Sequence, residues 1–204
     1  QHIYAKMAYN PEKDFVPITK AVSGPQVLVV PANSPFKSVK DVIDAAKKQP
    51  GKLTFAHAGI GSQTHLAGEN FVNSAKIDAV QVPYKGEGPA LTGLVGGDTA
   101  FSVTNVAAAI GHVNSGRLRA LGVTSKGEFP LMPGVPSIAK TLPGFENTGW
   151  FGLFAPAGTP AAIVERLNAE VNAILKTPAF IEKLAKTGAE PGGGSARDFT
   201  SFVA

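Results

Sequence analysis

Residues 52–69 read KLTFAHAGIGSQTHLAGE: an apolar run, two glycines, and then small polar residues ahead of a helical pattern. This order is typical of a buried strand, a glycine turn and the first turn of a helix. The start of a helix directs unpaired backbone N–H groups and the positive end of the helix dipole toward one point. The stretch therefore predicts a place where an anion binds.

The composition indicates a globular protein that handles small molecules. Hydrophobic residues make up 44% and charged residues 17% of the 204 residues, as in folded chains. The net charge of +4 is scattered, which argues against nucleic acid as a partner and leaves a mild preference for small anions. The absence of cysteine excludes disulfides and thiolate metal sites. No apolar run reaches the ~18 residues of a membrane span, so we expect no direct membrane insertion.

Strand-like apolar runs alternate with helical patterns between residues 24 and 125. We expect strands at 26–30, 53–58, 79–83, 99–103 and 119–124, and helices at 38–49, 62–74, 88–95 and 106–115. Ser38 followed by Asp41 is a capping box that supports the first helix. This alternation with short connections is typical of the α/β class, with a mostly parallel sheet covered by helices on both faces. Residues 24–125 are therefore expected to form one complete lobe.

The alternation of strand and helix patterns ends after residue 125. Residues 126–149 are rich in proline and glycine, and an apolar strand follows at 149–155. Three helix starts come next, at Thr159-Pro160, at Thr177-Pro178 and at Ser195 with Asp198. One strand and three helices cannot build a sheet alone. We therefore expect residues 126–204 to be a crossover and an incomplete part of a second lobe, with residues 1–23 as a crossover segment leading into the first.

The two glycines of the turn also invite a nucleotide-binding interpretation. Gly59 and Gly61 start a G-x-G-x-x-G pattern, but its third small residue would be Thr64, and the next strand ends without an acidic residue. G-x-x-x-x-G-K-[ST], G-x-S-x-G and H-E-x-x-H are all absent. A Rossmann-like nucleotide-binding enzyme is kept as the alternative.

Ser62 and His65 share a helix face and could suggest a nucleophile and its base. No acid is placed to orient the imidazole, so we expect Ser62 to cap the helix and His65 to donate a hydrogen bond from its first turn. His57 is expected to be a satisfied core or rim histidine, and His112 a surface one. The four histidines lack the spacing of a metal site. We therefore predict no catalytic residue, no metal and no cofactor.

Two more strand ends carry flexible or polar residues. Tyr84, Lys85 and Gly86 follow one strand, and Thr104 with Asn105 follows the next. Ligands of open α/β sheets bind outside the carboxyl ends of the strands, so these turns are expected to converge on one crevice with Tyr84 as a wall. One charge-assisted hydrogen bond contributes about 1.5–3 kcal/mol, and micromolar binding needs about 8 kcal/mol. A second binding surface is therefore expected.

Ordered motifs cover nearly the whole chain. They are YNPEKDFVPI at 9–18, AAK at 45–47 with PGKL at 50–53, GIGS at 59–62 with HLAGE at 65–69, VPYKG at 82–86, GG at 96–97, GRLRALGVT at 116–124, PGVPS at 133–137, and WFGL at 150–153 with APAGTP at 155–160. As an ordered set they resemble the Bug-type (TctC-like) periplasmic solute-binding receptors of tripartite tricarboxylate transporters. The chain departs from the family pattern at Ala58, where serine is common, and at Ala100, where aspartate is usual.

The resemblance implies a periplasmic-binding-protein-like (Venus flytrap) fold of two α/β lobes closing on a small carboxylate, which could be a di- or tricarboxylate, an amino acid or an aromatic acid. It also implies a periplasmic location, the permease subunits of the transporter as partners, and no enzymatic activity. The implied ligand-binding residues are Ala58, Gly59, Gly61, Ser62, His65, Tyr84, Lys85, Gly86, Thr104 and Asn105. We expect this chain to lack the family's N-terminal segment, with its glycine-rich first turn, and the final helix.

Overall fold

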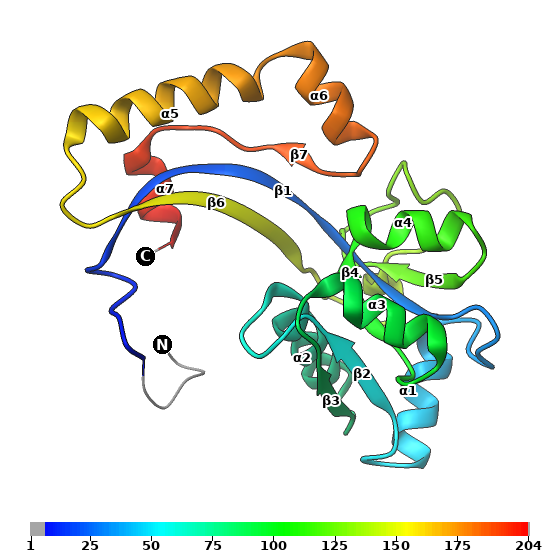
Figure 1. Cartoon of the computed structure of the whole chain (residues 1–204). Coiled ribbons are helices and arrows are strands. Elements are labelled where there is room, and N and C mark those ends of the chain that lie inside the picture. The colour runs from blue at the N-terminus through cyan, green and yellow to red at the C-terminus, as the bar shows by residue number, and fades with distance from the viewer. Residues whose placement is uncertain (1–6, 204) are drawn as a thin grey trace. The chain divides into compact units, whose positions relative to one another are not determined.

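The computed structural model describes residues 7–203, which divide into two compact units (Figure 1). The central unit spans Pro25–Gly149. The flanking unit combines the residues up to Gly24 with those from Trp150 onward. The two units are linked by strands β1 and β6, each of which has residues in both.

The central unit alternates strands and helices as the sequence predicts. Strand β1 (Phe15–Pro31) enters it and is followed by α1 (Val39–Lys48), β2 (Thr54–His57), α2 (Gln63–Ala75), β3 (Val80–Pro83), α3 (Glu87–Gly96), β4 (Ser102–Asn105), α4 (Val106–Asn114), β5 (Leu118–Val123) and the short 3-10 helix η1 (Ile138–Lys140). Ser38 and Asp41 form the expected capping box at α1. The α/β fold class is confirmed. Strand β1 begins at Phe15, well before the expected residue 26, and η1 was not expected, whereas the other elements listed lie within three residues of their expected bounds.

One strand of the sheet runs against the others. Strands β2 and β3 pair in parallel, and a parallel bridge from Phe55 to Phe101 joins β2 to the start of β4. Strand β1 lies between β4 and β5 and is antiparallel to both, with Val27 opposite Thr104 and Val30 opposite Arg119. The expected mostly parallel sheet therefore contains an antiparallel strand. An apolar run has the same pattern in either direction, so sequence periodicity does not report strand direction.

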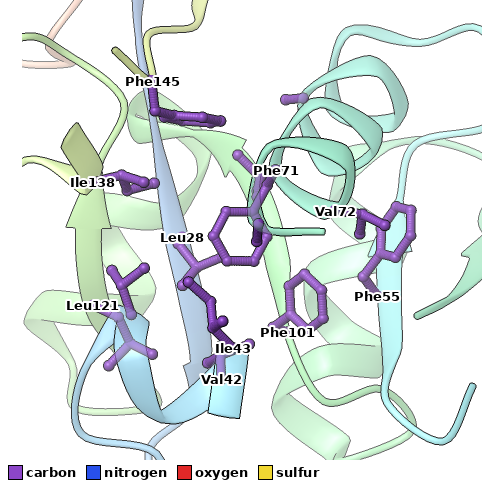
Figure 2. Close-up of a cluster of buried hydrophobic side chains, with 14 of the residues drawn as sticks. Leu28, Val42, Ile43, Phe55, Phe71, Val72, Phe101, Leu121, Ile138 and Phe145 are labelled. Carbon is purple, nitrogen blue, oxygen red and sulfur yellow. The ribbon is translucent and has the colours of Figure 1, made fainter. Parts of the chain in front are cut away.

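Both faces of β1 are buried within the central unit. The side chains of β1 alternate between two cores: Leu28 and Val30 join one, and Val27 and Val29 join the other. The first core packs α1 and α2 against the sheet, and aromatic rings dominate it (Figure 2). The second core packs α3 and α4 through Leu91, Leu94, Val106 and Ala109. This double burial explains why β1 is apolar without interruption from Val27 to Val30.

The proline- and glycine-rich segment after β5 belongs to the central unit. Ile138 and Phe145 are buried in the first core, and Met132 is buried in the second. A backbone bridge also joins Val123 of β5 to Ser137. The unit therefore extends to Gly149, further than the lobe boundary expected at residue 125.

The flanking unit holds the remaining elements. They are β6 (Thr148–Pro156), α5 (Ala161–Leu175), α6 (Pro178–Ala185), β7 (Glu190–Pro191) and α7 (Ala196–Val203), with β6 and β7 both pairing with β1. The expected strand and the three expected helices are therefore confirmed. Ile18, Ala155 and Val164 form a small core. No helix in the described range 7–203 is both long enough and apolar enough to cross a bilayer.

Two of the three predicted caps in this unit differ from expectation. Ser195 and Asp198 form the reciprocal hydrogen bonds of a capping box. The hydroxyl groups of Thr159 and Thr177 instead donate to carbonyl oxygens three residues earlier in the chain. These threonines close the preceding turn, so proline alone marks the start of each helix.

Candidate functional site

Three strand-to-helix turns lie at one edge of the central sheet. Strands β2, β3 and β4 run in the same direction, so their carboxyl ends share that edge. The backbone N–H of Tyr84 donates to the carbonyl oxygen of His57 at 2.9 Å, which joins the first two turns. The edge therefore brings together the sequence-predicted residues 58–62, 84–86 and 104–105.

The first of these, residues 58–62, is called the β2–α2 turn. Its glycines adopt a backbone that other residues avoid, with φ of +119° at Gly59 and +79° at Gly61. Ser62 caps α2 as predicted, because its hydroxyl oxygen accepts a hydrogen bond from the backbone N–H of His65. The glycines thus direct the chain from β2 into the start of α2, where the helix dipole is positive.

Much of the turn's donor capacity is already used inside the protein. The N–H of Ala58 donates to Oγ1 of Thr64 at 2.9 Å, and the N–H of Ser62 donates to the carbonyl oxygen of Gly59 at 3.1 Å. The N–H groups of Gly59 and Gly61 each donate to a histidine side chain. The expectation of several unpaired N–H groups is therefore wrong for these four residues, because three of the N–H groups donate to nearby side chains and the fourth donates to a backbone carbonyl oxygen.

The two histidine partners are His57 and His65, called the histidine pair below. Nδ1 of His57 accepts from Gly59 at 3.2 Å, and Nδ1 of His65 accepts from Gly61 at 3.3 Å. The two rings lie 4.5 Å apart between centroids, and the residues are 0% and 7% exposed. Burial lowers the pKa of His57, and the His65 imidazole lowers it further.

Both histidines differ in part from expectation. His65 donates from the first turn of α2 as predicted, through its backbone N–H to the Ser62 hydroxyl, but its ring also accepts a hydrogen bond from Gly61, which was not predicted. His57 is a core histidine as predicted, but only its Nδ1 is satisfied. The Nε2 atoms of both rings are buried without a hydrogen-bond partner among residues 7–203. Oε1 of Glu69 is 3.8 Å from Nε2 of His65, which is too long for a hydrogen bond.

At the second turn, the Tyr84 side chain packs against the helix that follows. The Tyr84 ring lies over α3, where a Cβ atom at Gly93 would be 2.7 Å from its Cζ. Gly93 is therefore the small residue that makes room for the ring. Burial, followed by the Asp98 carboxylate, raises the pKa of the Tyr84 phenol. Lys85 is exposed, and Gly86 precedes α3 with φ of +117°.

At the third turn the chain supplies its own carboxylate. Oε1 of Glu87 accepts a hydrogen bond from the Thr104 hydroxyl, and it accepts one from the Asn105 N–H at 2.8 Å. The Asn105 side-chain amide donates to both carboxylate oxygens, at 3.1 and 3.0 Å. Thr104 and Asn105 were predicted to face a ligand, and these donors are instead used by Glu87. An acidic residue in the first turn of α3, ahead of a polar strand end, is the signal that could have identified it.

We expect Glu87→Ala to lower the free energy of unfolding by about 1.5–3 kcal/mol, the net value of hydrogen bonds to a charged group. The substitution removes the acceptor shared by Thr104 and Asn105. Urea unfolding of the chain measures the change. Glu128→Ala is the matched control, because that side chain is 80% exposed and lies 4.0 Å from Lys140. Equal midpoints for the two variants would contradict this assignment.

Two cavities are lined by residues other than those of the three turns. One, of about 560 Å³, is lined by α5, α6 and residues 191–195 of the flanking unit. The other, of about 370 Å³, is lined by Asn70, Ser74 and residues 142–146 of the central unit. Within residues 7–203, no three histidine or acidic side chains gather as metal ligands would.

The fold of the chain is that of periplasmic binding proteins. In solved structures, the chain is similar to "R. palustris Rpa4515 with adipate", at 36% identity and a TM-score of 0.93, covering 98% of this chain and 68% of that one. It is also similar to "MatC (Rpa3494) from Rhodopseudomonas palustris with bound malate", at 30% identity and a TM-score of 0.92, covering 98% and 70%.

The family profile described as "Tripartite tricarboxylate transporter family receptor" (TctC) matches residues 1–204. The chain belongs to this family. Among curated relatives it is 42% identical to the "UPF0065 protein in tcbD-tcbE intergenic region" of Pseudomonas sp. (strain P51), over 94% of this chain and 58% of the relative. It is 34% identical to "Protein BugT" of Bordetella pertussis (strain Tohama I), over 90% and 56%.

These matches confirm the resemblance found in the sequence. The family is one of solute-binding receptors and not of enzymes, which excludes the Rossmann-like nucleotide-binding enzyme considered as the alternative. The chain spans less than two thirds of the length of these two curated relatives.

Proposed function

We propose that this chain is part of an extracytoplasmic receptor that captures a small carboxylate for a tripartite tricarboxylate transporter. The observation that carries the proposal is the β2–α2 turn, whose positive-φ glycines and capping serine lead into the positive end of α2. Similar proteins of known structure have adipate and malate in their names, which supports a carboxylate as the ligand.

We assign the sequence-predicted site residues two different roles. Ala58, Gly59, Gly61 and Ser62 form the surface that receives the carboxylate, and Lys85 adds an exposed positive charge at the neighbouring turn. His65 acts from behind the turn through Gly61. Ala58 has no hydroxyl, and the N–H groups of these four residues already have acceptors inside the protein, so the attraction for a carboxylate comes from the positive end of α2.

Tyr84, Gly86, Thr104 and Asn105 support the site in this proposal. Tyr84 packs on α3, while Thr104 and Asn105 hold the Glu87 carboxylate. A negative side chain at the third turn disfavours a second external carboxylate there, because like charges repel. The periplasm as location and the permease subunits as partners are part of the same proposal, on the strength of family membership.

A thermal-shift panel tests the function. The chain is heated with adipate, malate, citrate, ATP and NAD, with hexane-1,6-diol as the uncharged control for adipate. A dicarboxylate at a hundred times its Kd should raise Tm by about 5–10 °C. A shift with ATP or NAD and none with any acid would contradict the proposal.

A further inference from the structure

Each ring of the histidine pair holds one backbone N–H of the same glycine turn. The bonds run from Gly59 to Nδ1 of His57 and from Gly61 to Nδ1 of His65. The rings touch each other, with centroids 4.5 Å apart, and both residues are at least nine-tenths buried. The β2–α2 turn is therefore held from inside the protein by two adjacent imidazoles.

The chemistry of imidazole makes this support sensitive to protons. A neutral imidazole accepts a hydrogen bond at one nitrogen and carries its proton on the other. Since Nδ1 is the acceptor in both rings, the proton of each lies on the buried Nε2. A protonated imidazole donates from both nitrogens and accepts at neither. Protonation of His57 would thus place two donors, Nδ1–H and the Gly59 N–H, against each other.

The surroundings of His57 favour its neutral form. Burial and the His65 imidazole of α2 lower the pKa of His57, whereas the Gly59 N–H, the Gln81 side chain of β3 and the Glu69 carboxylate of α2 raise it. The residues of β4 are uncharged, and the Glu87 carboxylate of α3 is bound by Thr104 and Asn105. Burial is the dominant influence and lowers the pKa of His57. The ring is therefore neutral near pH 7 and gains its proton only below its ordinary value of about 6.5.

We propose that His57 and His65 are positioning residues that hold the β2–α2 turn in its binding conformation only while both rings are neutral, so that the receptor releases its carboxylate as the pH falls. The release rests on the proposed function, whereas the proton-sensitive support of the turn does not. If only the neutral pair binds ligand, affinity falls by up to tenfold for each pH unit below the titration of His57.

An NMR titration of the unliganded chain tests the support of the turn directly. Long-range ¹⁵N–¹H correlation spectra report which nitrogen of each imidazole carries the proton, and amide spectra follow Gly59 and Gly61 from pH 8 to pH 5. We expect the Nε2–H form of both rings at pH 8, and a shift of the Gly59 amide with a midpoint below 6.5. The Nδ1–H form of His57, or a Gly59 amide that does not move, would overturn the proposal.

Variants distinguish the effect of protonating His57 from the effect of its packing. In His57→Asn, Oδ1 takes the place of Nδ1 and accepts from Gly59 at any pH, so its Gly59 amide should not titrate. His112→Asn is the matched control: burial lowers the pKa of His112 too, but this histidine lies on α4, not at the turn. A Gly59 amide that titrates alike in wild type and His57→Asn would overturn the proposal. If His57→Asn does not fold, the NMR titration of the wild-type chain decides the proposal by itself.

Calorimetric titration of the chain with adipate then tests the link to binding. The affinity of His57→Asn relative to wild type should rise by up to tenfold per pH unit below the wild-type midpoint, whereas the ratio for His112→Asn should stay constant. Because every variant meets the same adipate, titration of the ligand cancels in these ratios. A constant ratio for His57→Asn would overturn the proposed release. No binding of any acid, with a Gly59 amide that still titrates, would overturn the carboxylate function and support the role of the histidine pair.

Discussion

Phe71→Ala is expected to lower the free energy of unfolding of the chain by about 3–5 kcal/mol, the cost of truncating a buried aromatic side chain. Phe71 lies on α2 and is 0% exposed. Its ring meets Phe101 and Phe145 edge-on, with centroid distances of 5.8 and 6.3 Å. The substitution would leave a cavity between α2, β4 and the segment that follows η1 (Figure 2).

Leu66→Ala is the control for this prediction, because Leu66 lies on the same helix and is 49% exposed. Urea unfolding followed by circular dichroism measures both variants. Leu66→Ala should shift the urea midpoint little, because the Leu66 side chain buries little apolar surface in the folded protein. A Phe71→Ala midpoint as close to wild type as that of the control would show that α2 is not anchored as described.

Gly59→Ala is expected to weaken carboxylate binding about 5- to 150-fold. Alanine at this backbone conformation costs about 1–3 kcal/mol of strain, and the turn would distort to relieve that strain. Gly59 has a φ of +119°, and an added Cβ would lie 3.4 Å from the carbonyl oxygen of Tyr84. The turn would therefore move away from the conformation that directs the chain into α2. Calorimetric titration with the acid identified by the thermal-shift panel measures the loss.

Gly97→Ala is the matched control for Gly59→Ala. Gly97 also has a positive φ, of +86°, but it follows α3 at the opposite end from the strand-end turns, and nothing lies within 4 Å of an added Cβ. It should lose stability and keep its affinity. Equal losses of affinity in both variants would mean that strain anywhere in the unit weakens binding, which would contradict a specific role for Gly59.

The alternation of elements could be predicted because it rests on local patterns. Ser38 with Asp41 marked the start of α1, and the small polar Ser62 marked the start of α2. The direction of β1 could not be predicted, since an apolar run reads alike either way. The packing of residues 126–149 could not be predicted, because their proline and glycine content is typical of a loop. Their buried residues Met132, Ile138 and Phe145 are also too widely spaced to form a periodic pattern.

The site was predicted as a location and not as a set of contacts. The glycines, the cap and the shared sheet edge follow from strand order and turn chemistry. The acceptor role of His65, the packing of Tyr84 on Gly93 and the Glu87 carboxylate at Asn105 depend on side-chain directions set by tertiary packing. These three contacts are the ones that the sequence analysis missed or assigned differently.

The central claim is that the β2–α2 turn receives a carboxylate, and amide NMR of the ¹⁵N-labelled chain titrated with adipate tests it most directly. We expect saturable shifts of the amide resonances of residues 59–65, and no such shifts with hexane-1,6-diol. Saturable shifts confined to the residues that line the flanking-unit cavity, such as Asn172 and Gly193, would place the ligand elsewhere and contradict the account.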